Sequence, residues 1–245
     1  MIPVDNYSDD GYGNKYSSYL PSISIVFYMI LLTSSVAGQK LISIYGIVIS
    51  AGNIIFQISY MLIVCITELY GLKQARKIII TGALCNLFVS YYLYLVVKIP
   101  GASFWLNQDI FSQVTLITSN ILFTSTIAYV ISEIANAKII SKLQVFFKSK
   151  WFLVRAVFST SIASILDTTF MLPVIISHSP SKVVSIYSSL ILMKIVYSIA
   201  LIPILWILVD FLRKKEPLFG NDGFVPFSSV SYMKNSGIHK LRIND

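Results

Sequence analysis

The sequence predicts an all-α membrane protein with six transmembrane helices and both termini in the cytoplasm. Two observations support this prediction. Hydrophobic residues make up 56% of the 245-residue chain and charged residues only 12%, with a mean hydropathy of +0.75, whereas about 25% of the residues of a soluble domain are charged. The net charge of +8 comes from short clusters of Lys and Arg between apolar segments. This distribution follows the positive-inside rule of membrane proteins and argues against a surface that binds nucleic acid.

The apolar segments define the expected helices in chain order. A transmembrane helix needs about 20 consecutive, mainly apolar residues. Six segments meet this requirement: 20–38, 52–69, 76–97, 110–136, 152–177 and 183–211. Residues 1–19 are polar and lack the basic start of a signal peptide, so we expect a retained N-terminal tail. Residues 20–211 then form the transmembrane domain, and residues 212–245 form a basic cytoplasmic tail.

Two short segments connect the first three helices. Segment 39–51 is apolar but shorter than a transmembrane helix, and it contains Gly46. We expect a strand-like or re-entrant connector there, with an extension of the second helix as the alternative. At the end of the second helix, Tyr70 suits the membrane interface and Gly71 breaks the helix.

The orientation follows from the basic residues of the loops. Three Lys or Arg residues lie in 70–77, five in 137–155 and six after Phe211. The intervening loops contain one each, which are Lys40, Lys98 and Lys182. Because cytoplasmic loops carry the excess of basic residues, the richer loops are expected in the cytoplasm. Six helices then place both termini on that side.

Charged residues inside the apolar segments are candidate functional groups, because each costs at least about 2.5–3.5 kcal/mol at the centre of a transmembrane helix. At 1.5 Å per residue, Asp167 lies roughly 21 Å from the cytoplasmic start of its helix, and Lys194 lies roughly 16 Å from the outer start of the last helix. Both positions are near the middle of the bilayer. We therefore expect Asp167 and Lys194 to neutralise each other or to bind a polar ligand together; the alternative is an ion pair that only fixes helix packing.

The other charged residues lie nearer the membrane surface. Arg155 either extends its guanidinium to the cytoplasmic surface or contributes to the site. Glu68 and Glu133 either pair with cations of the loops or face a cavity, and Asp210 is expected at a solvated helix end. Polar residues also recur at helical spacing along one face of 118–136: Ser125, Tyr129, Ser132, Glu133 and Asn136.

Four segments resemble the queuosine precursor transporters, also called the vitamin uptake transporter family. They are ITELYGLKQARKIIITG (66–82), AYVISEIANAKII (128–140), VRAVFSTSIASILDTTF (154–170) and Lys194 in the last helix. The likeness covers roughly residues 25–210. The chain departs from the family pattern at four places, where the family has Asp, Gln, Gln and Pro: Val64, Glu133, Ser164 and Gln57.

The resemblance implies a fold similar to the substrate-binding subunit of energy-coupling-factor transporters, in the inner membrane of a bacterium. It implies import of a 7-deazaguanine (preQ0, preQ1 or queuine), with membrane lipid as the surroundings and no cofactor or metal; a homo-oligomer is left open. The expected substrate-binding residues are Asp167, Lys194, Arg155, Glu133, Tyr129, Ser161, Glu68 and Phe170. The carboxylate of Asp167 suits the N1–H and 2-amino donors of a guanine edge, and Lys194 or Arg155 suits its O6. Glu133, in place of a neutral Gln, favours a precursor with an amine over one with a nitrile.

Two other classes of function were weighed. An intramembrane serine protease needs a Ser–His pair in the bilayer, but His178 lies in an outer loop and His239 in the tail. An aspartyl protease needs two Asp residues at depth, and only Asp167 qualifies, so no enzymatic activity is expected. The second alternative is a binding subunit that works with a separate ATP-driven module. Such subunits present small residues four apart on the first helix, and Ser34-x-x-x-Gly38 matches this pattern in part.

Overall fold

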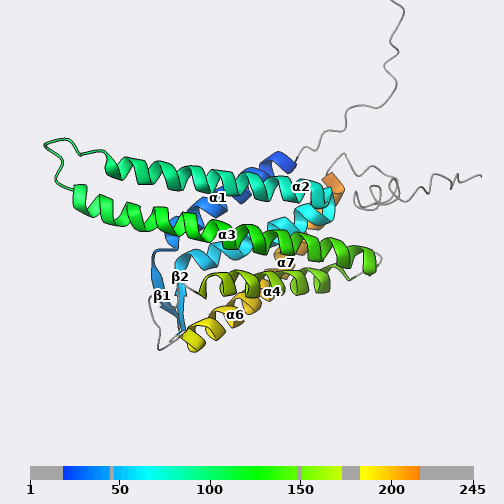
Figure 1. Ribbon diagram of the computed structural model, residues 1–245. Coiled ribbons are helices and arrows are strands. Elements are labelled where there is room, and N and C mark those ends of the chain that lie inside the picture. Colours follow the sequence, from blue (N-terminus) through cyan, green and yellow to red (C-terminus); the bar gives the residue numbers. More distant parts are fainter. Residues whose placement is uncertain (1–18, 45–46, 148–150, 173–182, 216–245) are drawn as a thin grey trace, which may run out of the picture.

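The computed structural model describes residues 19–44, 47–147, 151–172 and 183–215. Figure 1 shows an elongated bundle of helices with a small hairpin of strands at its lower left. The elements are α1 (Leu20–Ala37), β1 (Leu41–Ile44), β2 (Ile47–Ser50), α2 (Ala51–Lys98), α3 (Gln108–Phe146), α4 (Phe152–Phe170), α6 (Val183–Ala200) and α7 (Ile202–Lys215). Helix α2 packs against α1 and α3, α3 packs against α4, and α4 packs against α6.

The connector after α1 is a β-hairpin. Strands β1 and β2 are antiparallel, with Leu41 opposite Ser50 and Ile44 opposite Ile47. The backbone N–H of Ala51 donates to the carbonyl of Lys40 (2.8 Å) and so closes the hairpin at the start of α2. The strand-like connector expected for 39–51 is confirmed, and the alternative of a longer second helix is wrong.

Helices α1 and α2 approach each other closely at the base of this hairpin. A Cβ atom on Gly52 would lie 2.1 Å from the carbonyl oxygen of Ser34 and 2.8 Å from the Cα of Gly38. Both distances are shorter than any real contact of a side chain, so the close approach requires glycine at position 52. Ser34 and Gly38 are therefore engaged by α2 within the bundle.

Helix α2 contains the second and third predicted helices, joined at one residue. Gly71 has φ 82° and ψ 164°, a conformation that only glycine adopts readily, and it is the one non-helical residue within α2. Figure 1 shows that the chain reverses direction there, so the second half of α2 returns beside the first. The predicted break at Gly71 is confirmed. The predicted loop 70–77 is much shorter than expected, because helical residues resume directly after it.

Helix α3 continues through Phe146, whereas the sequence analysis placed the end of the fourth helix at residue 136 and a loop after it. The prediction of a loop over 137–146 is wrong. Three residues on one face of this extension, Ala137, Ile140 and Gln144, are buried. The extension is helical because this face packs against the bundle, while its Lys residues lie on other faces.

The predicted sixth helix, 183–211, is broken into α6 and α7. The two helical parts Tyr187–Ala200 and Ile202–Lys215 meet at a bend of 44°. Pro203 explains the bend, because it lacks a backbone N–H and its ring conflicts with the carbonyl four residues earlier. The prediction of one continuous helix is therefore wrong. The predicted end of the fifth helix, 171–177, lies mostly outside the described residues.

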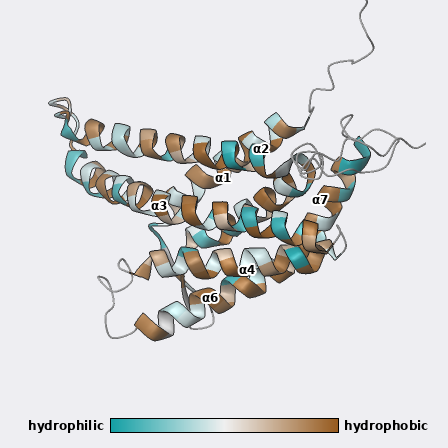
Figure 2. Ribbon diagram, turned by 45° about the vertical axis from the view of Figure 1, so that its right-hand side comes forward, coloured by the Kyte–Doolittle hydropathy of each residue, from teal (hydrophilic) through white to brown (hydrophobic). Residues whose placement is uncertain are grey.

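The helices have the length and composition of membrane-spanning segments. Among the described residues, α1, α2, α3 and α4 each qualify, and α6 with α7 adds a fifth if the bent pair is one span. In this list of membrane-spanning candidates, α2 is a single helix, although it contains two of the six helices predicted from the sequence. Figure 2 shows apolar residues along the helices, and Met29, Phe88 and Phe123 are among the exposed apolar side chains. The chain is a multi-pass helical membrane protein. Six crossings and their orientation stay predictions.

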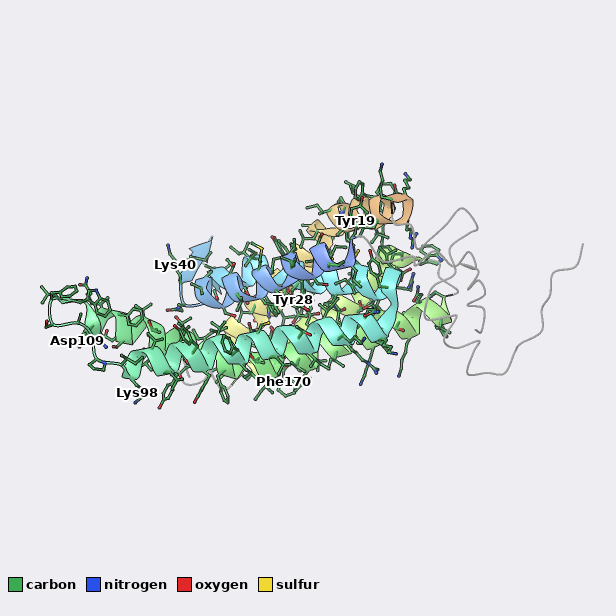
Figure 3. All side chains as sticks on the ribbon, turned by 90° about the horizontal axis from the view of Figure 1, so that it is seen from above. Tyr19, Tyr28, Lys40, Lys98, Asp109 and Phe170 are labelled. Atoms are coloured by element: carbon green, nitrogen blue, oxygen red, sulfur yellow. The ribbon has the colours of Figure 1, made fainter. Side chains whose placement is uncertain are left out.

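The basic segments gather at one end of the bundle. Arg155 near the start of α4 and Arg213 in α7 both contact Glu68, three residues before the break in α2. The rings of Tyr19 and Phe211 are in edge-to-face contact at 5.9 Å, which places the start of α1 at the same end. Lys40, Lys98 and Asp109 lie at the opposite end (Figure 3).

Candidate functional site

An ion pair between Asp167 of α4 and Lys194 of α6 lies inside the bundle. The Nζ of Lys194 donates to Oδ2 of Asp167 at 2.6 Å and to Oγ1 of Thr168 at 3.0 Å. The side chains are only 10% and 6% exposed. The expectation that these two residues neutralise each other is confirmed. No partner within the described residues is bonded to the second oxygen of Asp167, so this carboxylate still has an unused acceptor.

Gln57 in α2 connects this pair to a third helix. Its Nε2 donates to the backbone carbonyl of Lys194 at 2.9 Å and lies 3.4 Å from the hydroxyl oxygens of Ser164 and Ser198. Ser198 also donates to the carbonyl of Lys194, at 2.8 Å. Gln57 is 2% exposed. Helices α2, α4 and α6 therefore hold the lysine through its backbone as well as its side chain.

A second polar group lies between α2 and α3. Ser59 donates to Oε1 of Glu133 at 2.8 Å, and Nδ2 of Asn136 lies 3.5 Å from Oε2 of the same carboxyl. The hydroxyl of Tyr60 donates to Ser132 at 3.1 Å. Glu133 is fully buried, and it forms no ion pair with any described residue. The alternative that Glu133 pairs with cations of the loops is therefore not seen among the described residues.

The two polar groups are parts of one region. Asp167 and Glu133 are close enough to interact electrostatically with each other and with the ring hydroxyl of Tyr60. Tyr60 lies one helical turn beyond Gln57 on α2, so this helix carries side chains that reach both groups. The region contains two carboxyl groups and one side-chain cation, Lys194.

A third charged group is separate and lies at the end where the basic segments gather. The guanidinium of Arg155 donates two hydrogen bonds to Glu68, each 3.0 Å long, and both side chains are completely buried. Arg213, whose side chain is 38% exposed, lies 3.5 Å from the same carboxylate. Arg155 does not extend to the surface, so that alternative is wrong. Glu68 pairs with a helix residue rather than only with loop cations. This group ties α2, α4 and α7 together.

Three expected site residues have other surroundings. Tyr129 is buried and donates its hydroxyl to the backbone carbonyl of Ile79 at 2.8 Å, so this hydroxyl is already engaged in joining α3 to the second half of α2. Ser161 is half-buried on α4. Phe170 is 46% exposed and lies at the edge of the bundle in Figure 3. Among the described residues, the hydrogen-bonding partners of the Asp167–Lys194 pair do not include Ser161 or Phe170.

The sequence analysis missed the neutral residues that complete the site. Gln57, Ser59, Tyr60 and Ser198 hold the charged groups, yet none is charged. Gln57 was noticed only as a departure from a family pattern. The position of Gln57 inside an apolar segment was itself a signal. Burying an amide costs free energy unless hydrogen-bonding partners compensate for the loss of water.

Two cavities differ in their relation to these groups. The larger, about 460 Å³, lies between the start of α4 and α7, is lined by residues such as Trp151 and Trp206, and does not reach the Asp167–Lys194 pair. The smaller, about 50 Å³, is lined by Gln57 and Lys194, with Asn53 and Tyr197 beside them and Ile49 of β2 at the hairpin end. It has room for water, and its volume is far below the 300–1,000 Å³ of typical ligand pockets.

The chemistry of the region suits a ligand rich in hydrogen-bond donors. Among the described residues, no group of three or more His, Cys, Asp or Glu residues could hold a metal ion. Within the part of the chain that the structure describes, three buried side-chain oxygens accept no hydrogen bond: Gln57 Oε1, Asn86 Oδ1 and Asn136 Oδ1. Two of these, in Gln57 and Asn136, belong to the polar region described above. Buried acceptors of this kind normally accept a hydrogen bond from a water molecule or from a ligand.

Comparison with known proteins gives one match. A family model described as "Putative vitamin uptake transporter" matches residues 50–208, which include α2, α3, α4, α6 and the first half of α7. No curated protein and no solved structure matches the chain.

Proposed function

The chain belongs to the vitamin uptake transporter family, and we propose that it imports a 7-deazaguanine precursor of queuosine across the inner membrane. The observation that carries this proposal is the buried Asp167–Lys194 pair, an acceptor and a donor held at mid-helix by three helices. Groups of this kind inside a membrane protein mark a substrate pathway more often than a packing contact.

The pair is complementary to the edge of a guanine. An ionised carboxylate accepts two parallel N–H donors, and a guanine edge presents N1–H and the 2-amino group side by side. Asp167 receives these two donors, and Lys194 donates to O6. The hydrogen bond between Lys194 and Thr168 keeps the lysine near this position.

Glu133 gives a preference among the precursors. It is buried with Ser59 and Asn136 as its partners and has no cationic partner among the described residues. A substrate with an amine on its 7-substituent supplies this cation, whereas a nitrile supplies only an acceptor. A charge-assisted hydrogen bond contributes roughly 1.5–3 kcal/mol, or about tenfold to a hundredfold in affinity. The amine-bearing precursor or queuine is therefore the preferred substrate.

The direction of entry follows from the two ends of the bundle. The end with the basic segments is closed by the buried Glu68–Arg155 pair and Arg213. The small cavity at Gln57 and Lys194 lies toward the hairpin. With six crossings and the basic segments in the cytoplasm, the hairpin end faces outward, and the substrate enters there.

One observation disfavours the alternative of a binding subunit for an ATP-driven module. The only sequence feature for that alternative was Ser34-x-x-x-Gly38. Ser34 is 6% exposed, and its carbonyl and the backbone of Gly38 are in contact with Gly52. These small residues are therefore used for packing inside the chain rather than offered to a partner.

Uptake of a labelled amine-bearing 7-deazaguanine into cells that lack their own transporter tests the proposal. Asp167→Asn, which removes an acceptor and unbalances Lys194, is expected to abolish high-affinity uptake while the protein still inserts. Asp210→Asn is the matched control, because Asp210 is 43% exposed and pairs only with Lys214 at the end of α7. Wild-type protein without uptake, or normal uptake by Asp167→Asn, would contradict the proposal.

A further inference from the structure

Gln57 is the one buried amide that lines the small cavity. Its Nε2 is turned toward the backbone of α6, where it donates to the carbonyl of Lys194 at 2.9 Å. This hydrogen bond fixes the orientation of the amide, because the opposite orientation would bring two oxygen acceptors together. The oxygen Oε1 is therefore on the side away from that carbonyl.

This oxygen has no hydrogen-bond donor, although Gln57 is 2% exposed. A buried acceptor without a donor destabilises the protein, and native structures contain few of them. The neighbouring donors are directed elsewhere: Lys194 Nζ donates two of its three hydrogen bonds to Asp167 and Thr168, and Ser198 donates to the lysine carbonyl. The acceptor is therefore available to a donor that enters the cavity.

We infer that Gln57 Oε1 is a second acceptor for the substrate, which binds the ring N9–H and so selects the free base against N9-substituted forms. The inference rests on the proposed function. A 7-deazaguanine has two ring N–H donors, N1–H and N9–H. Asp167 takes N1–H together with the 2-amino group, so N9–H is the ring donor that remains. Both acceptors are held by the same lysine, one through its side chain and one through its backbone.

The lining of the cavity agrees with this selection. Near Gln57, the small cavity is bordered by the apolar side chains of Ile54, Leu190 and Met193. A substituent on N9 removes the donor and also adds volume where the walls are apolar. An N9-substituted base therefore loses the hydrogen bond and adds volume beside apolar side chains, whereas the free base keeps its donor.

The test separates the hydrogen bond from the steric effect. Competition for uptake is measured with the free base and its N9-methyl derivative, in wild type and in Gln57→Met, which keeps the length of the side chain and removes the amide. Because the methyl group meets a side chain of similar size in both proteins, a change in the ratio of the two inhibition constants reports the hydrogen bond. We expect this ratio to fall about tenfold in Gln57→Met, equivalent to about 1.4 kcal/mol.

Asn86→Leu is the matched control. Asn86 is also a buried amide with an unpartnered oxygen, it is 2% exposed, and it does not line this cavity. The control is expected to keep the wild-type ratio. If Gln57→Met does not reach the membrane, Gln57→Asn replaces it. The shorter side chain moves the amide oxygen away from the substrate by one methylene group, so the ratio of the two inhibition constants is again expected to fall.

The outcomes distinguish the two proposals. Uptake by wild type with an unchanged ratio in Gln57→Met, as expected if the oxygen only holds a water molecule, would overturn the role of Gln57 and leave the proposed function intact. An equal fall of the ratio in Asn86→Leu would also overturn it. Failure of wild type to take up or bind any 7-deazaguanine would overturn the proposed function and this inference together.

Discussion

Removing the charge of Glu68 is expected to destabilise the protein strongly. Arg155 is completely buried and donates two hydrogen bonds of 3.0 Å to this carboxylate. Glu68→Gln keeps the size of the side chain but removes the carboxylate charge with which the guanidinium pairs. Removing one partner of a buried ion pair costs about 3–5 kcal/mol, because the remaining charge is uncompensated. For a chain of this size, the expected fall in melting temperature is about 6–20 °C.

The assay is thermal unfolding of the purified protein in detergent, followed by loss of the monodisperse peak. Two variants serve as controls. Asp210→Asn removes an exposed ion pair at 2.7 Å, which contributes at most about 1 kcal/mol. The double variant Glu68→Gln with Arg155→Met removes both buried charges, and it is expected to recover much of the loss, because replacing a buried pair by apolar groups is often nearly neutral.

Two results would refute this reasoning. One is a melting temperature of Glu68→Gln within about 2 °C of wild type, which corresponds to a contribution of about 1 kcal/mol or less. The other is a double variant that is less stable than Glu68→Gln alone, which would mean that the uncompensated arginine is not the cause.

Three further predictions follow from other parts of the structure. For the topology, a cysteine at Lys73 is expected to react only from the cytoplasm and one at Lys98 only from outside, in a background without Cys65 and Cys85; labelling of both from one side would end the six-helix arrangement. Gly52→Ala is expected to lower the stability by about 1–3 kcal/mol in the same thermal assay, because its Cβ would lie 2.1 Å from the carbonyl of Ser34; an unchanged melting temperature would show that α1 moves freely. For the substrate, competition for uptake by nitrile and amine precursors is compared in wild type and Glu133→Gln. The preference for the amine over the nitrile is expected to fall by about tenfold to a hundredfold in the variant. Equal competition in both proteins would exclude a role for Glu133.

The expected depth of each residue in the membrane was sufficient to predict the central ion pair. Asp167 and Lys194 lie on separate helices, and each distance from the membrane surface follows from the rise per residue. Two opposite charges at similar depth are expected to form an ion pair, because either charge alone is costly in lipid. The break at Gly71 was equally accessible, since glycine followed by a basic cluster marks the end of a transmembrane helix.

Depth alone did not determine which way a residue faces. Arg155 is near the expected membrane surface, where a long side chain can reach water, yet it is fully buried because Glu68 lies opposite it on another helix. The extension of α3 beyond residue 136 was missed for a related reason. A helix that leaves the membrane no longer needs to be apolar on all faces, and only the packing of Ile140 and Gln144 against the bundle shows that it continues.

The balance of donors and acceptors in the polar region argues for the kind of substrate proposed. Asp167 is paired with Lys194, but Glu133 has no cation among the described residues, and Gln57 and Asn136 each keep an unused oxygen. Both amides point their N–H groups at protein acceptors, namely the carbonyls of Lys194 and Tyr60. Every unsatisfied group is thus an acceptor. A ligand with several N–H donors and one positive charge completes these hydrogen bonds, whereas a nitrile on the same ring adds one more acceptor where donors are needed.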